Sequence, residues 1–391
     1  MIETNDLKFQ KSSLNIILTI KINAERIKQI NENLYIYVFK ESIKVYDCKT
    51  FEMKADLKLP LIRKEPMLDI LDNEILIYMA EKKLYFYKIN IAENKLVFMH
   101  YLSNICNFVY LSKRKEIFLL IESSCPNLKY CPNLKKRYEM AKCDLMGNII
   151  FTNKITPKII HQCVELVDFE KIYKNVSGFR EDSRGFIAFY GLCNEKYIIN
   201  ICGYCDQWYD IEPYWEIKSE INIYNVDDLK EILDKEYEYY LDYFKIGDNL
   251  FKFKKTKSFF FYNEKDNKIE YFNNIFNYLN NITDDELKWC YEEEIRENHM
   301  QKYFYLSDKL FAFLDKGNNL YVVDISNENK IVRKIESFWN EKEYFIKDID
   351  ILYNEKKDKE ENLYILFKDI RYRYLIGEET EGKIIHGIIE K

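Results

Sequence analysis

Ile43-Lys44-Val45-Tyr46-Asp47 is the stretch that decides the fold, because its pattern of apolar and polar residues recurs along the chain. An apolar, aromatic-rich segment precedes it, and period-2 alternation predicts that the two form a β-hairpin. The first strands of these hairpins begin near Leu34, Ile75, Ile117, Tyr197, Leu250, Leu310 and Leu363. The second strands begin near Ile43, Leu84, Met140, Ile221, Phe259, Leu320 and Tyr372. Seven copies at about 55 residues per unit predict a repeated fold.

Short strand patterns before and after the hairpins, such as Met67 to Leu71 and Lys330 to Ile335, bring each unit to four strands. Five hairpins are tight, with 9 or 10 residues between the two strand starts. The third and fourth copies have separations of 23 and 24 residues. Two neighbouring units therefore carry an insertion at the same place. The third copy also has Lys142 where the pattern expects an apolar residue.

Repeats of four strands are typical of a β-propeller, in which each blade packs against its neighbours. The Ile-x-Val-Tyr-Asp phrase resembles the third strand of WD40-type blades, where an aromatic residue precedes an Asp. Gly-His and Trp-Asp pairs are missing, and ten glycines are few for such a protein. The resemblance implies an all-β, seven-bladed propeller of four-stranded antiparallel blades, with residues 1–391 as a single domain. Either residues 15–22 or residues 383–389 would close the ring.

Two segments show helical spacing within this β pattern. Thr283 to Glu286 reads as a capping box, and apolar residues on one face predict a short helix over 283–298. Residues 227–244 also have apolar residues at helical spacing, but 221–229 matches the hairpin pattern of 43–51. We expect a strand there, followed by irregular structure.

The composition favours a strand-rich globular protein. Of the 391 residues 47% are hydrophobic, with 33 Tyr and 26 Phe, although A/T-rich codons also favour these aromatics. Net charge is −6, with 59 basic and 65 acidic residues well mixed, so no nucleic-acid partner is expected. The densest basic stretch alternates with Phe251 and Phe253, as the solvent face of one strand would: Lys252, Lys254, Lys255 and Lys257.

The chain has no segment that predicts a membrane span or a secretory signal. Residues 14–20 are too short and no small-residue cleavage site follows them. The ten cysteines are therefore expected to be reduced thiols in the cytoplasm, without membrane contact.

The unusual length of the chain gathers in connections that would emerge on one rim of a propeller. These connections span residues 122–137, 155–183, 203–216 and 273–300 and contain three of the four tryptophans; the fourth, Trp339, lies in the connection after the sixth hairpin. Trp and Tyr are enriched where proteins bind partners. Five residues are therefore candidate contacts for a protein or peptide partner: Trp208, Tyr209, Tyr214, Trp215 and Trp289. The alternative is a small apolar core beneath the long loops.

The insertions of the third and fourth hairpins each contain a pair of cysteines. Four thiolates from Cys125, Cys131, Cys202 and Cys205 could hold Zn²⁺ in a tetrahedral site. The alternative is that these are ordinary, partly buried thiols. A redox dithiol at Cys202 and Cys205 would need a helix starting there, and Pro213 and the strand-like flanks disfavour one.

Enzyme signatures are mostly missing from the sequence. It has no Gly-x-Ser-x-Gly elbow, no phosphate-binding glycine loop and no His-Glu-x-x-His motif. The leading hypothesis is a non-catalytic scaffold that binds a protein or peptide on its loop-rich face. Two alternatives stay open: an enzyme or small-ligand binder that uses the central funnel, and a zinc-stabilised interaction module.

Overall fold

The computed structural model of the chain describes its strands and most of their shorter turns. The described residues are 8–21, 26–31, 34–38, 42–47, 50, 52–59, 67–72, 74–80, 82–123, 137–155, 184–209, 213–237, 243–253, 259–272, 303–306, 310–314, 319–324, 331–335, 344–352, 360–369 and 382–390. Within these ranges the chain consists of strands and turns, without a helix, so the predicted all-β class is confirmed. The helix predicted over 283–298 lies outside the described residues.

Five sheets contain four strands each, and strands that follow one another in the chain are neighbours in the sheet. The first contains β2 (Arg26–Asn31), β3 (Leu34–Val38), β4 (Ser42–Asp47) and β5 (Met53–Lys58). The second contains β6 (Met67–Leu71), β7 (Ile75–Ala80), β8 (Lys83–Asn90) and β9 (Lys95–Ser103). The third contains β10 (Ile105–Leu111), β11 (Glu116–Ser123), β12 (Arg137–Cys143) and β13 (Ile149–Ile155).

The fourth sheet contains β14 (Arg184–Leu192), β15 (Tyr197–Tyr209), β16 (Pro213–Asn225) and β17 (Glu231–Tyr237). The fifth contains β18 (Tyr243–Gly247), β19 (Leu250–Phe253), β20 (Phe259–Asn263) and β21 (Lys268–Phe272). The remaining strands form one sheet of eight in the order β22-β23-β24-β25-β1-β28-β27-β26. Their bounds are β22 (Tyr303–Tyr305), β23 (Leu310–Leu314), β24 (Leu320–Asp324), β25 (Ile331–Ile335), β1 (Lys8–Lys21), β28 (Gly382–Glu390), β27 (Glu360–Asp369) and β26 (Tyr344–Leu352).

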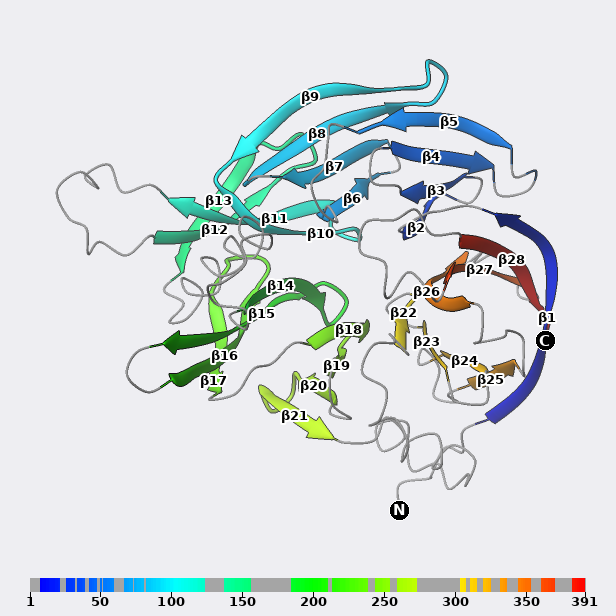
Figure 1. The fold of residues 1–391 in the computed structure, drawn as a ribbon. Helices are drawn as coiled ribbons and strands as arrows, with labels where there is room; N and C mark the ends of the chain where they lie inside the picture. The colour runs from blue at the N-terminus through cyan, green and yellow to red at the C-terminus, as the bar shows by residue number, and fades with distance from the viewer. Residues whose placement is uncertain are drawn as a thin grey trace.

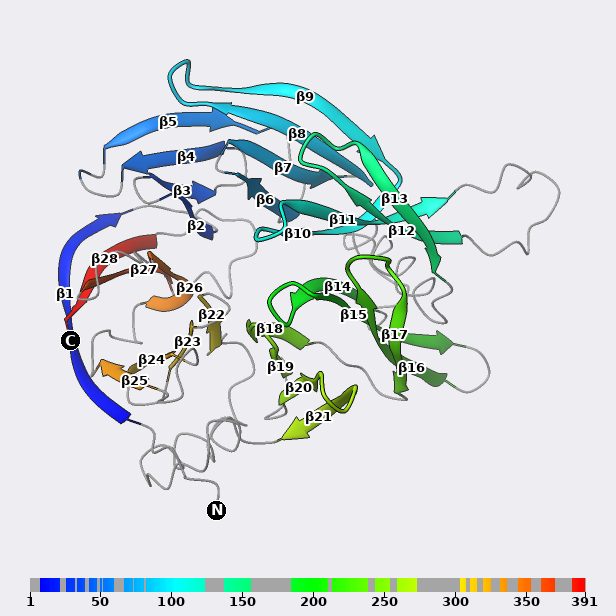
Figure 2. The same cartoon turned by 180° about the vertical axis from the view of Figure 1, so that it is seen from behind.

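The sheets stand side by side around a ring, as the blades of a β-propeller do (Figures 1 and 2). Neighbouring strands within each four-stranded blade are antiparallel, as predicted. In each blade the second strand turns into the third at the same end of the ring, and we call this end the upper rim. The lower rim holds the turns between the first and second strands and between the third and fourth.

The N-terminal strand β1 joins the two halves of the eight-stranded sheet. Its first part pairs parallel with β25, from Lys8↔Ile331 to Ser12↔Ile335. Its second part pairs antiparallel with β28, from Ser13↔Glu390 to Lys21↔Lys383. Residues 15–21 and 383–389, which the sequence offered as alternatives, thus lie in strands that pair with each other (Figure 1).

Six of the seven predicted hairpins correspond to paired strands, and the seventh needs a correction. From β3–β4 to β23–β24, the two strands of each predicted hairpin pair antiparallel. In the last unit β27 pairs directly with β28, so the third strand is Gly382–Glu390 and does not begin near Tyr372. The segment 372–376 is rich in aromatic and apolar residues and the segment 382–390 is rich in isoleucine, and the sequence pattern matched the wrong one.

Both faces of a blade are buried, because each face packs against a neighbouring blade. In β11, Ile117 and Leu119 join the apolar cluster shared with the β6–β9 blade. The alternate residues Phe118 and Leu120 join the cluster shared with the β14–β17 blade. This arrangement explains why many strands read as continuous apolar runs instead of alternating with polar residues.

Burial of both faces overturns one prediction about charge. Lys252 was expected on a solvent face, yet only 5% of it is exposed. Its ammonium group lies over the ring of Phe259, at 5.0 Å from the centroid, and over that of Tyr303 at 5.5 Å. These cation–π contacts accommodate the buried charge between two blades.

The segment 227–244 is not helical where it is described. Strand β16 ends at Asn225, and a turn leads into β17 at Glu231. Leu229 in this turn is fully buried and has a positive φ of 53°. The predicted strand is therefore confirmed in part, but a further strand follows where we expected irregular structure. The misleading helical spacing combines the buried turn residue Leu229 with Ile232 and Leu233, which are partly buried on opposite faces of β17.

Candidate interaction surface

The hairpin of β15 and β16 differs from the loop that its sequence predicted. Residues 203–216 were expected to form a long loop, but both strands run for 13 residues and only residues 210–212 join them. Aromatic residues extend through this stretch, and such residues favour a pleated strand over a loop. The other insertion, residues 124–136 between β11 and β12, lies outside the described residues.

The upper end of this hairpin extends past its own blade. Strand β14 pairs with β15 only as far as Cys205, and β17 pairs with β16 only from Ser219 onward. Residues 206–209 and 213–216 therefore pair, among the described strands, with each other alone. We call these residues the ribbon.

Four of the five predicted contact residues lie in the ribbon. Trp208 is directly opposite Tyr214, and Tyr209 is directly opposite Pro213, with Trp215 facing Gln207 across the strands. Because side chains alternate between the faces of a strand, Trp208 and Tyr214 belong to one face and Tyr209 and Trp215 to the other. The fifth residue, Trp289, lies outside the described residues.

The cysteine pair of this insertion is placed on a continuous strand. Cys202 and Cys205 are three residues apart in β15, so alternation assigns them to opposite faces. Cys202 is fully buried and its Sγ lies 3.8 Å from the donor Nδ2 of Asn200. Cys125 and Cys131 lie outside the described residues, and the four-cysteine zinc site stays a prediction. In the described part of the chain, no three His, Cys, Asp or Glu residues are grouped to hold a metal.

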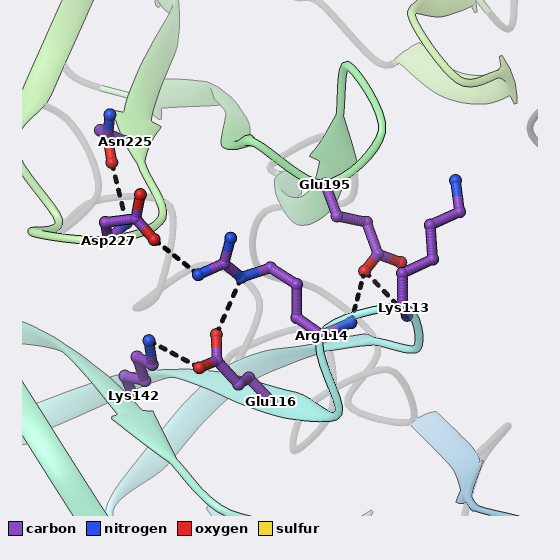
Figure 3. Close-up of polar contacts among 7 residues, drawn as sticks. All are labelled: Lys113, Arg114, Glu116, Lys142, Glu195, Asn225 and Asp227. Atoms are coloured by element: carbon purple, nitrogen blue, oxygen red, sulfur yellow. Dashed lines mark hydrogen bonds and ion pairs between the residues drawn. The ribbon is translucent and has the colours of Figure 1, made fainter.

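The blade that carries the ribbon is fastened to the preceding blade at the lower rim (Figure 3). Glu195, between β14 and β15, is 7% exposed and has a positive φ of 63°. One carboxylate oxygen accepts hydrogen bonds from the backbone N–H groups of Lys113 at 2.9 Å and Arg114 at 3.2 Å. The other lies 3.4 Å from the hydroxyl of Ser112. The carboxylate thus satisfies donors of the β10–β11 turn.

Arg114 adds an ion pair between the same two blades (Figure 3). Its guanidinium donates to Asp227 at 2.5 Å, in the β16–β17 turn, and to Glu116 at 3.1 Å on its own blade. The second oxygen of Glu116 is 2.7 Å from the ammonium of Lys142. This pairing explains how Lys142 occupies a position where the repeat expects an apolar residue.

A row of buried polar side chains runs along the blade beneath the ribbon. Asn200 and Asn222 are fully buried and opposite one another, with Nδ2 of Asn200 donating to Oδ1 of Asn222 at 3.2 Å. Nδ2 of Asn222 donates to Glu220 at 2.9 Å and to Asp234 at 3.3 Å. Burial, and next the charges of Glu231 and Glu220, raise the pKa of Tyr224 well above its usual value.

Sequence reasoning missed this row and the Glu195 contacts. A signal for the row was present, because Asn200 and Asn222 interrupt isoleucine runs whose neighbours on both sides are buried. In a strand buried on both faces, a polar residue needs a hydrogen-bond partner nearby. Glu195 carried no comparable signal, since acidic residues are common in exposed turns.

The chain matches no family model. A comparison with curated proteins likewise finds no match. Similar solved structures include the β-propeller domain of Cps50 (Swd1) from Myceliophteria thermophila, at 8% identity and a TM-score of 0.47, covering 94% of this chain and 99% of that one. Another is the C-terminal WD40 domain of Sif2, at 9% identity and a TM-score of 0.43, covering 98% and 99%.

A third is the acylaminoacyl peptidase of Pyrococcus horikoshii, at 10% identity and a TM-score of 0.43, covering 90% of this chain and 49% of that one. Identities and TM-scores this low indicate neither a shared function nor a family. The fold assignment rests on the strand order of the chain itself. Among the described residues, no helix is long and apolar enough to cross a membrane. By its strand order, the chain is a β-propeller built of four-stranded antiparallel blades.

Proposed function

We propose that the protein is a non-catalytic scaffold that binds a protein or peptide partner at its upper rim, with the ribbon as the main anchor. The observation that supports this proposal is the register of the ribbon, which pairs Trp208 with Tyr214 and sets Trp215 one position away. Aromatic side chains of this kind supply much of the binding energy at protein interfaces. Trp289 remains a predicted further anchor.

The base of the ribbon should limit the conformational entropy that is lost on binding. The ribbon continues two strands of a four-stranded blade, and the Glu195 and Arg114 contacts fasten this blade to its neighbour. A binding element held by a rigid base loses little conformational entropy when a partner docks.

We further propose that the ring has seven blades. The eight-stranded sheet would then comprise two blades, β22–β25 and β26–β28, with β1 supplying the fourth strand of the second and closing the ring. The antiparallel pairing of β1 with β28 supports this closure. A cytoplasmic location is part of the same proposal, and the free thiols of Cys106, Cys143, Cys193 and Cys202 suit a reducing compartment.

The test is partner capture with a Trp208→Ala/Trp215→Ala variant. Tagged chain is purified from cells of the source organism, co-purified proteins are identified by mass spectrometry, and the leading candidate is titrated in purified form. We expect the double variant to weaken its binding by roughly ten-fold or more, because each truncation removes an aromatic anchor.

A matched control removes two exposed aromatic side chains from the outer strand β9. Phe98 and Tyr101 are 53% and 50% exposed, and their replacement by Ala should leave the affinity within about two-fold. Equal affinities of wild type and the Trp208/Trp215 variant, with both chains folded by circular dichroism, would remove the ribbon from the proposed function.

A further inference from the structure

The junction between the β10–β13 and β14–β17 blades encloses two polar atoms without a hydrogen-bond partner among the described residues. These are the hydroxyl oxygen of Tyr224, which is 1% exposed, and Oδ1 of the fully buried Asn200. Tyr224 belongs to the apolar cluster that the two blades share, and so does Ile198, with which Asn200 alternates in phase along β15. Buried polar atoms in folded proteins nearly always bond to protein or to ordered water, because an unpaired one is costly.

The carboxylates of the buried polar row fix the direction of the Asn200 amide. Nδ2 of Asn222 donates to Glu220 at 2.9 Å and to Asp234 at 3.3 Å. Because ionised carboxylates only accept hydrogen bonds, the amide nitrogen of Asn222 must face them and its Oδ1 must face Asn200. Nδ2 of Asn200 donates to that oxygen at 3.2 Å. The oxygen and nitrogen of Asn200 therefore cannot exchange places, and Oδ1 needs a donor from outside the row.

Tyr224 lies next to this row on the same face of the blade. Asn200 is directly opposite Asn222, and Tyr224 follows Asn222 by two residues along β16. Diagonal neighbours of this kind are within reach of a long aromatic side chain. Burial, followed by the charges of Glu231 and Glu220, raises the pKa of Tyr224, in agreement with a hydroxyl close to the row.

The two atoms differ in kind, and this difference restricts the ligand that could join them. The Tyr224 hydroxyl keeps its proton and can donate it, whereas the amide oxygen of Asn200 only accepts. A metal cation would satisfy Oδ1 but could not accept the hydroxyl proton. Water accepts and donates, and a buried water molecule usually makes about three hydrogen bonds to otherwise unsatisfied polar groups.

We propose that a buried water molecule bridges the hydroxyl of Tyr224 and Oδ1 of Asn200. It accepts the hydroxyl proton from β16 and donates to the amide oxygen on β15, so it links the two strands that continue into the ribbon. Glu195 and Arg114 fasten the same junction at the lower rim, and the water adds a polar link further along these strands. The site is independent of the identity of the partner.

High-resolution crystallography of the full chain tests the site directly. We expect a water peak within about 3.2 Å of both Oη of Tyr224 and Oδ1 of Asn200. Absence of a peak, or a direct hydrogen bond between the two side chains, would overturn the inference. An anomalous signal at the site after a Rb⁺ soak would overturn it too, because the occupant would then be a cation.

The Tyr224→Phe variant gives a test in solution whose sign decides. If the hydroxyl binds water, its removal should lower the thermal midpoint by about 1–2 °C at a fixed scan rate. If the hydroxyl is buried without a partner, its removal should leave the midpoint unchanged or raise it, which would contradict the proposal. Tyr262→Phe is the matched control, since the Tyr262 side chain is also buried and its hydroxyl donates to Asn267 at 2.8 Å. Its midpoint should fall.

A double-mutant cycle tests whether the two residues share the water. Asn200→Ala and Tyr224→Phe each remove one of its partners, so the midpoint shift of the double variant should be smaller than the sum of the single shifts. Additive shifts would show that the two side chains do not act through a common ligand, and the inference would fail.

Discussion

The carboxylate of Glu195 accepts a hydrogen bond from the backbone N–H of Lys113 at 2.9 Å, across the junction between two blades. The next junction repeats this relationship, because Asp248 accepts a hydrogen bond from the backbone N–H of Asn194 at 2.7 Å. Glu195 and Asp248 each stand two residues before the second strand of their blade. An acidic residue at this position thus links each of these blades to the turn of the preceding one.

Removal of the Glu195 carboxylate should destabilise the protein. In Glu195→Ala the N–H groups of Lys113 and Arg114 lose a charged acceptor in a partly buried setting, and we expect a loss of about 1–2 kcal/mol in unfolding free energy. Urea denaturation followed by circular dichroism measures it. Glu195→Gln keeps an acceptor oxygen and should lose less. Equal stability of Glu195→Ala and wild type would contradict the linking role.

Gly147 should not tolerate a larger residue. Its φ is +79°, and an added Cβ would lie 2.3 Å from Nε2 of His100 on the neighbouring blade. We expect Gly147→Ala to cost about 1–3 kcal/mol in unfolding free energy, from backbone strain and steric overlap.

His100→Ala provides the matched comparison for this overlap. In a double-mutant cycle, Gly147→Ala should cost less in the His100→Ala background, because the imidazole is no longer in the way. Additive effects within about 0.5 kcal/mol would show that only backbone strain acts at Gly147.

His100 should make stability fall at mildly acidic pH. Burial lowers the pKa of His100, although the negative charge of Asp144 opposes this shift in part. The unfolded chain therefore takes up a proton more readily than the folded chain. The contribution of neutral His100 to the unfolding free energy is fully present above its unfolded pKa of about 6.5. It is lost as pH falls through the lower pKa of the folded chain.

The measurement is the unfolding free energy from pH 8 to pH 5 for wild type and for His100→Gln, which cannot titrate. Below about pH 6.5, the unfolding free energy of wild type should fall relative to that of His100→Gln. The other histidines contribute equally in both chains, so their effects cancel in the comparison. A difference that stays constant across this range would contradict the lowered pKa.

Cys143 and Cys193 should resist alkylation in the folded protein. Burial, and next the charge of Asp144, raise the pKa of Cys143 to about 12. Burial, and next the charge of Asp248, raise the pKa of Cys193 to about 12 as well. Since the thiolate is the reactive form, iodoacetamide at about pH 8 should label both in urea and neither in buffer. Rapid labelling of either thiol in the folded chain, detected by peptide mass spectrometry, would contradict this expectation.

The repeat was predictable from sequence because the pattern of an apolar strand, a turn and a second apolar strand recurs in the six hairpins whose strands pair as predicted. The third strand of the last unit was not predictable, since two segments of similar pattern follow β27 and only the pairing with β27 identifies the strand. The aromatic residues of the ribbon were identified, but as part of a loop, because insertion length alone does not distinguish a longer loop from longer strands. Lys252 and Glu195 depend on contacts between blades, which local patterns do not encode.

The central claim, that the partner docks on the ribbon, is tested most directly by site-specific photo-crosslinking. A photoreactive phenylalanine analogue is placed at Tyr214 in the ribbon or, as a control, at the exposed Tyr271 on the outer strand β21, 40% exposed. After irradiation in cells, crosslinked peptides are identified by mass spectrometry. The account predicts that position 214, and not position 271, crosslinks to one partner. Crosslinks from position 271 alone, or none from position 214 to a partner that still binds, would contradict it.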